Sequence, residues 1–258
     1  MKQIMKPAIT AMAISFILIA CNNEEKKTDA TTSDSTAATT TTTETTSQEQ
    51  DMDALKIAPG LYTLVKDTMG IRVLNILYKP GDSSAMHSHP DNALYVIEGG
   101  KSEFIAKDGS KQVVELKSGE TMIGGAETHS VKNIGNNTVK AILVEVTRPN
   151  QAGNADMSMD ATKVASKFYT LVQDSLNMRI IKVDYKPGAE SAMHSHPDLV
   201  MYVISPAKTE FTAKDGTKQV MTLEKGMTMI VPADTHSVKN IGSTEAKVLL
   251  IEVNRPNK

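Results

Sequence analysis

The chain contains two copies of one segment, and this duplication limits the folds open to it more than any other feature. Residues 61–150 align with residues 168–257 at a constant offset of 107 without a gap, and 52 of the 90 aligned positions are identical. A copy of this length is the size of a small domain. We therefore predict two tandem domains of one fold, at residues 54–150 and 161–258, joined by a polar linker at 151–160.

Each copy has the sequence pattern of an all-β domain. In the first copy, runs rich in Val, Ile, Leu and Tyr cover residues 72–78, 94–97, 113–116 and 141–146. Turn signals such as Lys79-Pro80-Gly81 separate these runs. Turns spaced roughly 8–12 residues apart predict a β-sandwich or a β-barrel, and neither copy shows a helical periodicity.

Composition excludes several classes of function. With 28 basic and 30 acidic side chains the formal charge is −2, and the chain has no tryptophan. A nearly neutral chain with few aromatic residues predicts no nucleic acid partner. The single cysteine excludes an internal disulfide and a metal cluster held by thiolates.

The amino terminus has the pattern of an export signal. Lys2 and Lys6 precede an apolar run at 8–20, which is too short to span a bilayer. The run ends in Leu18-Ile19-Ala20-Cys21, which resembles a bacterial lipobox. That resemblance implies a signal peptide at 1–20 and diacylation of Cys21, followed by a disordered Thr-rich linker at 21–53. We expect a lipid-anchored protein of the bacterial cell envelope, and Asn22 slightly favours the outer membrane.

All six histidines lie inside the repeat, three in each copy. Because residues i and i+2 of a strand share a face, His87 and His89 project together, as do His194 and His196. A third histidine follows 40 residues later, at His129 and at His236. Three imidazoles that converge from two strands form a facial metal site with open positions. The alternative is a set of histidines packed or exposed around a turn.

These histidines lie in motifs that resemble those of the cupin superfamily. In the first copy the matching residues are Gly81, His87, His89, Gly119, His129 and Asn133. The second copy repeats both motifs, from Gly188 to His196 and from Gly226 to Asn240. The resemblance implies a bicupin, with two small barrels of the double-stranded β-helix or jelly-roll type and a metal site in each. The glutamate ligand of the motif is missing, because Asn92, Ala93, Leu199 and Val200 occupy its places.

Three further pairs of repeated residues are candidates for the site. Asp91 and Asp198 are the carboxylates nearest the histidine pairs, either as weak candidate metal ligands or as turn formers. Strand alternation directs Arg72 and Arg179 toward the barrel interior, where they would bind a substrate carboxylate. We prefer the alternative that these arginines pair with a buried acid, such as Glu103/Glu210 or Glu145/Glu252. The last pair, Tyr95 and Tyr202, is expected to face the metal as catalytic residues or to pack in the core.

Two functions follow from these expectations. The first is a metal-dependent oxygenase of the three-histidine kind acting on a small organic substrate, with Fe(II) favoured and Mn, Zn, Ni or Cu compatible with imidazole ligands. The second is a surface lipoprotein that binds a metal or a small ligand without turnover. The expected partners are a small molecule and, through Cys21, a membrane. The duplication supplies the two domains of a dimer within one chain, and the sequence is compatible with a further homo-oligomer of whole chains.

Overall fold

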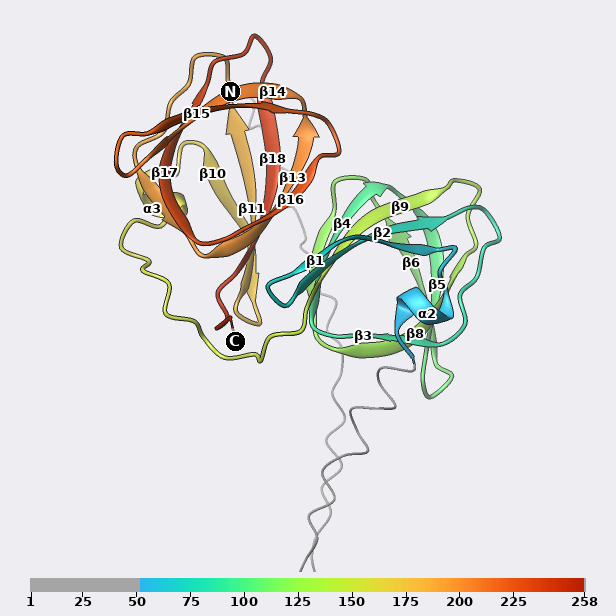
Figure 1. The fold of residues 1–258 in the computed structure, drawn as a ribbon. Coiled ribbons are helices and arrows are strands. Elements are labelled where there is room, and N and C mark those ends of the chain that lie inside the picture. The colour runs from blue at the N-terminus through green and yellow to red at the C-terminus, as the bar shows by residue number, and fades with distance from the viewer. Residues whose placement is uncertain (1–51, 258) are drawn as a thin grey trace, which may run out of the picture. The chain divides into compact units, whose positions relative to one another are not determined.

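A computed structural model describes residues 52–257 of the chain (Figure 1). The predicted signal peptide, the lipidation site at Cys21 and the predicted Thr-rich linker up to residue 51 lie outside these residues. The linker was predicted to extend to residue 53, but Asp53 is ordered and caps the first helix. The first repeat holds one short helix and nine strands, which are α2 (Ala54–Ile57), β1 (Tyr62–Thr68), β2 (Ile71–Tyr78), β3 (His87–His89), β4 (Asn92–Glu98), β5 (Gly100–Ala106), β6 (Lys111–Leu116), β7 (Thr121–Gly124), β8 (Glu127–Asn133) and β9 (Val139–Val146).

The second repeat has the same elements in the same order. They are α3 (Ala161–Val164), β10 (Tyr169–Ser175), β11 (Met178–Tyr185), β12 (His194–His196), β13 (Asp198–Ser205), β14 (Ala207–Ala213), β15 (Lys218–Leu223), β16 (Thr228–Val231), β17 (Asp234–Asn240) and β18 (Ala246–Val253). Among the described residues, no helix is long and apolar enough to cross a membrane.

Each repeat forms a jelly-roll barrel from two antiparallel sheets, as Figure 1 shows for both sets of strands. In the first barrel the strand orders are β1-β2-β9-β4-β7 and β3-β8-β5-β6, and in the second they are β10-β11-β18-β13-β16 and β12-β17-β14-β15. The prediction of an all-β fold with two tandem barrels is confirmed. The two helices were not expected, because a single turn is too short to show a helical periodicity.

The central strands β9 and β18 explain why the sequence runs at 141–146 and 248–253 are almost continuously apolar. Both faces of each strand are covered. In β9, Leu143 packs inside its own barrel, whereas Ile142 and Val144 face a second apolar cluster together with Leu249 and Ile251 of β18. A strand that is buried on both faces needs apolar residues at successive positions.

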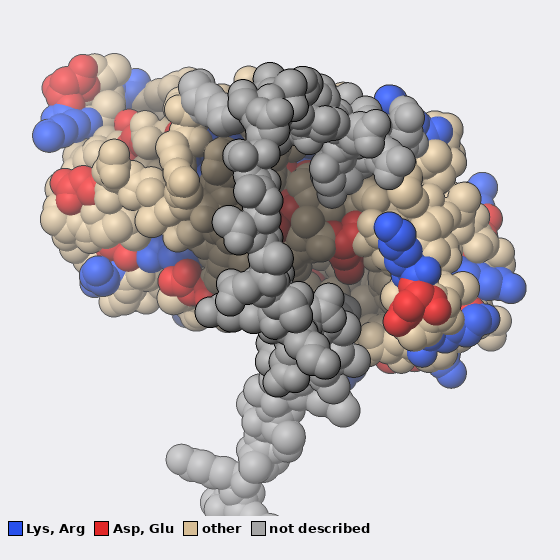
Figure 2. Space-filling view, turned by 90° about the horizontal axis from the view of Figure 1, so that it is seen from below, with Lys and Arg blue, Asp and Glu red and all other residues tan. Residues whose placement is uncertain are grey.

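The β1–β2 and β10–β11 hairpins connect through two-residue turns with positive φ at Met69 and Gly70 and at Leu176 and Asn177. Turns of this kind match the right-handed twist of the strands that they join. On the face shown in Figure 2, the acidic and basic side chains of the described residues are interspersed.

Candidate metal centre

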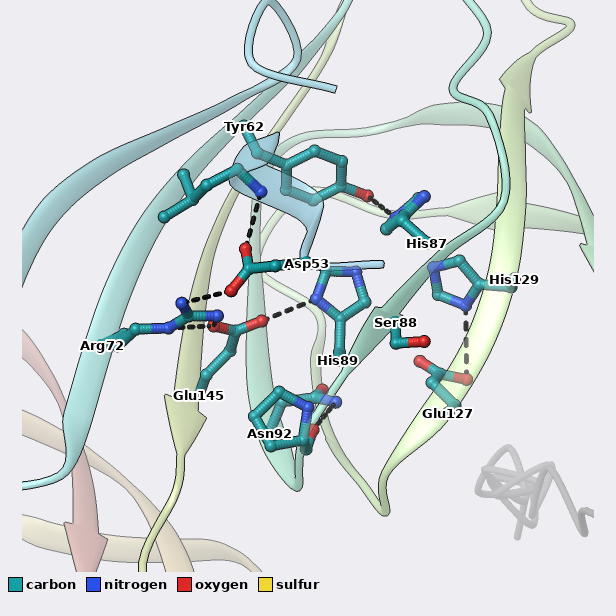
Figure 3. Close-up of polar contacts among 12 residues, drawn as sticks. Asp53, Tyr62, Arg72, His87, Ser88, His89, Asn92, Glu127, His129 and Glu145 are labelled. Carbon is teal, nitrogen blue, oxygen red and sulfur yellow. Dashed lines mark hydrogen bonds and ion pairs between the residues drawn. The ribbon is translucent and has the colours of Figure 1, made fainter. Parts of the chain in front are cut away.

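The three histidines of each repeat meet inside their barrel. His87 and His89 lie on the short strand β3, and the antiparallel register places His129 of β8 directly opposite His87. One ring nitrogen from each histidine lies within 4.8 Å of the others, and the same holds for His194, His196 and His236. Figure 3 shows the first three rings turned toward one another. The structure therefore brings together all six predicted histidines, as two separate triads.

Hydrogen bonds fix which nitrogen carries the proton in two of the three rings of the first barrel. His87 Nδ1 donates to the carbonyl oxygen of Ala85 at 2.8 Å, and His89 Nδ1 donates to Glu145 Oε1 at 2.7 Å. His129 Nδ1 lies 3.4 Å from Glu127 Oε2. Because carbonyl and carboxylate oxygens only accept, the Nδ1 atoms of His87 and His89 carry the protons and leave lone pairs on Nε2. This arrangement is typical of metal-binding histidines.

The second barrel repeats this pattern and leaves one fully buried ring nitrogen without a partner. His194 Nδ1 donates to Ala192 at 2.8 Å, His196 Nδ1 to Glu252 at 2.6 Å, and His236 Nδ1 to Asp234 at 3.1 Å. The Nε2 atom of His194 is buried and has no hydrogen-bond partner. A buried acceptor without a partner carries a free-energy cost. The donor set and this free lone pair fit a divalent cation held by three imidazoles.

A network of charged residues lies behind the second histidine of each pair. Arg72 binds Glu145 through Nε at 2.8 Å and Asp53 through Nη1 at 2.6 Å, as Figure 3 shows. The second barrel has the equivalent network of Arg179, Glu252 and Asp160. The network fixes the glutamate that orients His89 or His196. In each network one guanidinium contacts two carboxylates, and one of these carboxylates contacts the histidine.

Burial keeps the first histidine of each pair neutral. Loss of hydration lowers the pKa of His87 to about 4, and the same cause lowers the pKa of His194 to about 4. A metal ion binds the neutral form of imidazole, so protons compete weakly for these two ligands near neutral pH. Burial alone would raise the pKa of Asp160, but hydrogen bonds from Arg179 and Thr162 outweigh that effect and hold it at about 2.

A tyrosine lies beside the histidines in each barrel. Tyr62 Oη lies 3.0 Å from His87 Nε2 and accepts a hydrogen bond from Tyr78 at 3.2 Å. Its counterpart Tyr169 contacts the ring of His194 with centroids 4.7 Å apart. Burial raises the pKa of both Tyr62 and Tyr169, so each phenol stays protonated and acts as a donor.

A cavity of about 200 Å³ lies next to the second triad. The polar side chains that line it are Tyr169, Tyr185, His196, Thr209, Gln219, Asp234 and His236. The rest of its wall is mainly apolar and includes Leu199, Met201, Phe211, Met221, Met229 and Leu250. A largely apolar cavity with a few convergent polar groups is the usual form of a small-molecule site.

The other predicted site residues lie elsewhere or serve another contact. Tyr95 and Tyr202 do not face the histidines: they belong to the apolar cluster shared by the two repeats, and their rings lie 5.3 Å apart. They stand on strands whose alternation directs these rings away from the barrel interior. Arg72 and Arg179 contact the buried Glu145 and Glu252, as in the alternative that we preferred, so neither guanidinium is free to bind a substrate carboxylate.

Asp91 and Asp198 lie outside the histidine triads. The Oδ2 atom of Asp91 binds Arg255 at 2.8 Å, and Asp198 binds Arg148 at the same distance. The Oδ1 atom of Asp91 accepts the backbone N–H of Ala126. These contacts use both oxygens of Asp91, which explains why the carboxylate does not turn toward the metal centre.

Two pairs of site residues were not predicted from the sequence. Tyr62 and its counterpart Tyr169 are identical in the repeat, but nothing in their local pattern distinguishes them from core residues. Asp53 lies just before the predicted domain boundary, yet Met52-Asp53-Ala54 recurs as Met159-Asp160-Ala161 at the same offset of 107. Extending the alignment toward the amino terminus would have found this pair.

Comparison with known proteins supports the fold. No family model matches the sequence, and no curated protein gives a significant match. A Bacillus subtilis oxalate decarboxylase variant is 17% identical, with a TM-score of 0.52 over 73% of this chain and 70% of that one. The Lactobacillus farciminis oxalate decarboxylase formate complex is 13% identical, with a TM-score of 0.51 over 73% and 78%.

A cupin 2 conserved barrel domain protein from Leptotrichia buccalis is 15% identical, with a TM-score of 0.47 over 75% of this chain and 88% of that one. The two oxalate decarboxylases are only 17% and 13% identical to this chain, so their likeness is informative about the fold alone. The chain therefore has the β-barrel fold of the oxalate decarboxylases.

Proposed function

We propose that this chain is a bicupin that binds one divalent metal ion in each barrel through three histidines. The observation that carries the proposal is the direction of the lone pairs. The Nδ1 atoms of His194 and His196 donate their protons to Ala192 and Glu252, which lie outside the triad. The buried Nε2 atom of His194 has no protein partner. The cupin resemblance of the sequence motifs points to the same chemistry.

For the reaction, we propose a metal-dependent oxygenase acting on a small organic substrate. Bound to three histidines, the ion would supply a Lewis acid with open positions for oxygen and substrate. The apolar cavity holds the substrate away from water, and Tyr169 offers its O–H as a hydrogen-bond donor. The Glu252–Arg179–Asp160 network keeps the ring of His196 in its orientation.

The metal in this proposal is Fe(II), with Mn(II) as the first alternative. Three neutral imidazoles are also suitable ligands for Zn, Ni and Cu, so the ligands alone do not select one metal ion. Mn(II) enters because a related structure of Bacillus subtilis oxalate decarboxylase, 17% identical with a TM-score of 0.51 over 73% of this chain and 70% of that one, concerns that enzyme's Mn(II) centres.

A second candidate function is metal or ligand binding without turnover. Both repeats keep a complete triad and a complete charged network. An enzyme with one working barrel gives no reason to preserve the other site, whereas a binding protein gains capacity from both. Oxygen uptake by the Fe(II)-loaded protein, screened with phenolic and dioxo compounds, distinguishes the two functions.

The proposed location is the bacterial cell envelope, with the chain anchored through a lipid on Cys21 and the outer membrane favoured. The support is the Leu18-Ile19-Ala20-Cys21 sequence and the basic residues before it. Labelling cells with a radioactive fatty acid tests this location. We expect label on the wild-type protein and none on Cys21→Ser, and equal labelling of both would contradict the anchor.

Metal content tests the central part of the proposal. The purified protein is expected to contain or take up about two equivalents of metal, measured by mass spectrometry. His87→Ala and His194→Ala are each expected to lose about one equivalent because each removes a ligand from a different barrel. Failure of the wild-type protein to bind metal after anaerobic reconstitution would contradict it.

A further inference from the structure

The cavity of the second barrel has a lining that restricts what can bind there. Its volume of about 200 Å³ lies below the roughly 300–1,000 Å³ of usual ligand pockets, so the occupant is small. Three methionines, Met201, Met221 and Met229, contribute to its wall. Thioether side chains are flexible and polarisable, and they adapt to apolar ligands of irregular shape.

The charges around the cavity disfavour an anion. None of the residues that line the cavity is Lys or Arg, and the only lining carboxylate is Asp234. Arg179, which lies behind His196, already contacts both Glu252 and Asp160. A carboxylate in this apolar cavity would lose its hydration without gaining a cationic side chain. A metal ion on the histidines would be the one positive partner.

We infer that the second barrel binds a small, uncharged and largely apolar molecule with a single metal-coordinating group, and not a dicarboxylate. This inference rests on the proposed metal site. It distinguishes the chain from the oxalate decarboxylases whose fold it shares, because oxalate is small, doubly charged and has no apolar part.

The residues that form this wall differ between the two barrels at three notable positions. At the positions equivalent to Leu199, Met221 and Val231, the first barrel has Asn92, Val114 and Gly124. The Asn92 amide donates to the carbonyl oxygen of Pro90. The first barrel thus has a polar amide, a smaller apolar side chain and a glycine where the second has three larger apolar side chains, so we expect ligand selection to differ between the barrels.

Three imidazole probes test the inference in the His87→Ala protein, which keeps only the second triad complete. The protein is loaded with Co(II), whose visible d–d absorption reports changes in its ligands, and is titrated with imidazole, 4-phenylimidazole and 4-(imidazol-4-yl)benzoate. All three offer the same coordinating group. We expect 4-phenylimidazole to bind about tenfold more tightly than imidazole because the cavity buries its phenyl ring.

The benzoate is expected to lose that gain, since its carboxylate meets the apolar wall. A matched pair of variants locates the effect: Leu199→Asn, which introduces the residue of the first barrel, should reduce the preference for 4-phenylimidazole, whereas Leu199→Met should keep it. Equal binding of imidazole and 4-phenylimidazole, or tighter binding of the benzoate, would overturn the inference while leaving the metal site intact. Absence of Co(II) absorption would instead contradict the proposed function itself.

Discussion

His89 and His196 show at the residue scale how a buried glutamate prepares an imidazole for a metal. Each donates its Nδ1 proton to a carboxylate that a nearby arginine also binds. The carboxylate fixes the tautomer and the ring orientation, and it raises the basicity of the opposite nitrogen. In the proposed metal site, the strength of these histidines as ligands would therefore depend on residues outside the histidine triads.

Replacing the glutamate tests this dependence. Glu252→Gln keeps an acceptor for His196 but removes the negative charge, and it should weaken metal binding in the second barrel by about 10- to 100-fold. Competition with a coloured chelator measures the affinity. Glu210→Gln, which changes a carboxylate in a surface ion pair with Lys218, is the matched control and should leave the affinity unchanged. Equal affinity of Glu252→Gln and the wild type would contradict this role of Glu252.

At this scale the sequence predicted the ligands better than their surroundings. The histidines were found because their spacing is unusual and because it occurs twice. Glu145 and Glu252 gave a weaker signal, as single acids in apolar strands, and they were considered only as partners for arginine. Tyr62 has no local signal at all, because its contact with His87 depends on how strands far apart in sequence pack.

At the element scale, short segments place the histidines. Strand β12 has only three residues, and its middle residue, Ser195, donates its backbone N–H to Met159 in the segment before α3. Asp160 caps α3 through Thr162 and binds Arg179. The segment around Asp160 therefore connects the short histidine strand to the charged network.

The charge on Asp160 is expected to stabilise the fold in a pH-dependent way. Its pKa is about 2 in the folded chain, against an ordinary value of 3.8, so the stabilisation is fully present above pH 3.8 and is lost as the pH falls toward 2. Asp160→Asn preserves the helix cap but should lower the free energy of unfolding by about 2 kcal/mol at pH 7.

Urea unfolding at several pH values measures this effect. The difference between Asp160→Asn and the wild type should shrink from pH 4 to pH 2, because the wild-type carboxylate becomes protonated. Asp184→Asn, at an exposed carboxylate near Lys247, is the control and should change stability by less than about 1 kcal/mol. A difference that does not depend on pH would contradict the assignment to charge.

Element boundaries could be predicted only in part. The runs at 72–78 and 141–146 correspond closely to β2 and β9, because strands at the centre of a sheet keep a strong apolar pattern. The helices α2 and α3 are four residues long, too short for any periodicity, and their existence depends on tertiary contacts such as those of Asp53 and Asp160. The strands β3 and β12 have three residues each and were expected only from the His-x-His pairs that they hold.

At the scale of the whole described part of the chain, the two repeats contact each other through a pair of equivalent ion pairs. Arg148 at the end of the first repeat binds Asp198, and Arg255 at the end of the second binds Asp91. Each of these arginines also donates to the backbone oxygen of the other. Both aspartates directly follow a His-Pro pair, so these ion pairs connect the segment after each histidine pair to the other repeat.

Removing one of these arginines should destabilise the protein. Arg148→Met leaves Asp198 without its cation, and we expect a loss of about 3 kcal/mol in the free energy of unfolding, because one partner of a largely buried pair remains uncompensated. Lys140→Met removes an exposed partner of Glu98 and should cost less than about 1 kcal/mol. Similar stabilities for the two variants, measured by urea denaturation, would show that the ion pair between the repeats contributes little to the free energy of unfolding.

The duplication made the two-barrel architecture predictable, but the contacts between repeats were not. Asp91 and Arg255 are 164 residues apart in sequence, and the alignment shows only that each has a counterpart. Asp91 was therefore considered as a turn former or as a weak metal ligand. The alignment of the two copies shows which residues occur in both. It does not show which residue of the other copy each of them contacts.

Anomalous diffraction from crystals grown with the metal tests the central claim most directly. Data collected on both sides of the metal absorption edge are expected to show one peak in each barrel, bonded to the Nε2 atoms of its three histidines. In His194→Ala crystals the peak of the second barrel should disappear while that of the first remains. Ordered histidine triads without a peak, or peaks bonded to other residues, would contradict the proposal that these barrels are metal centres.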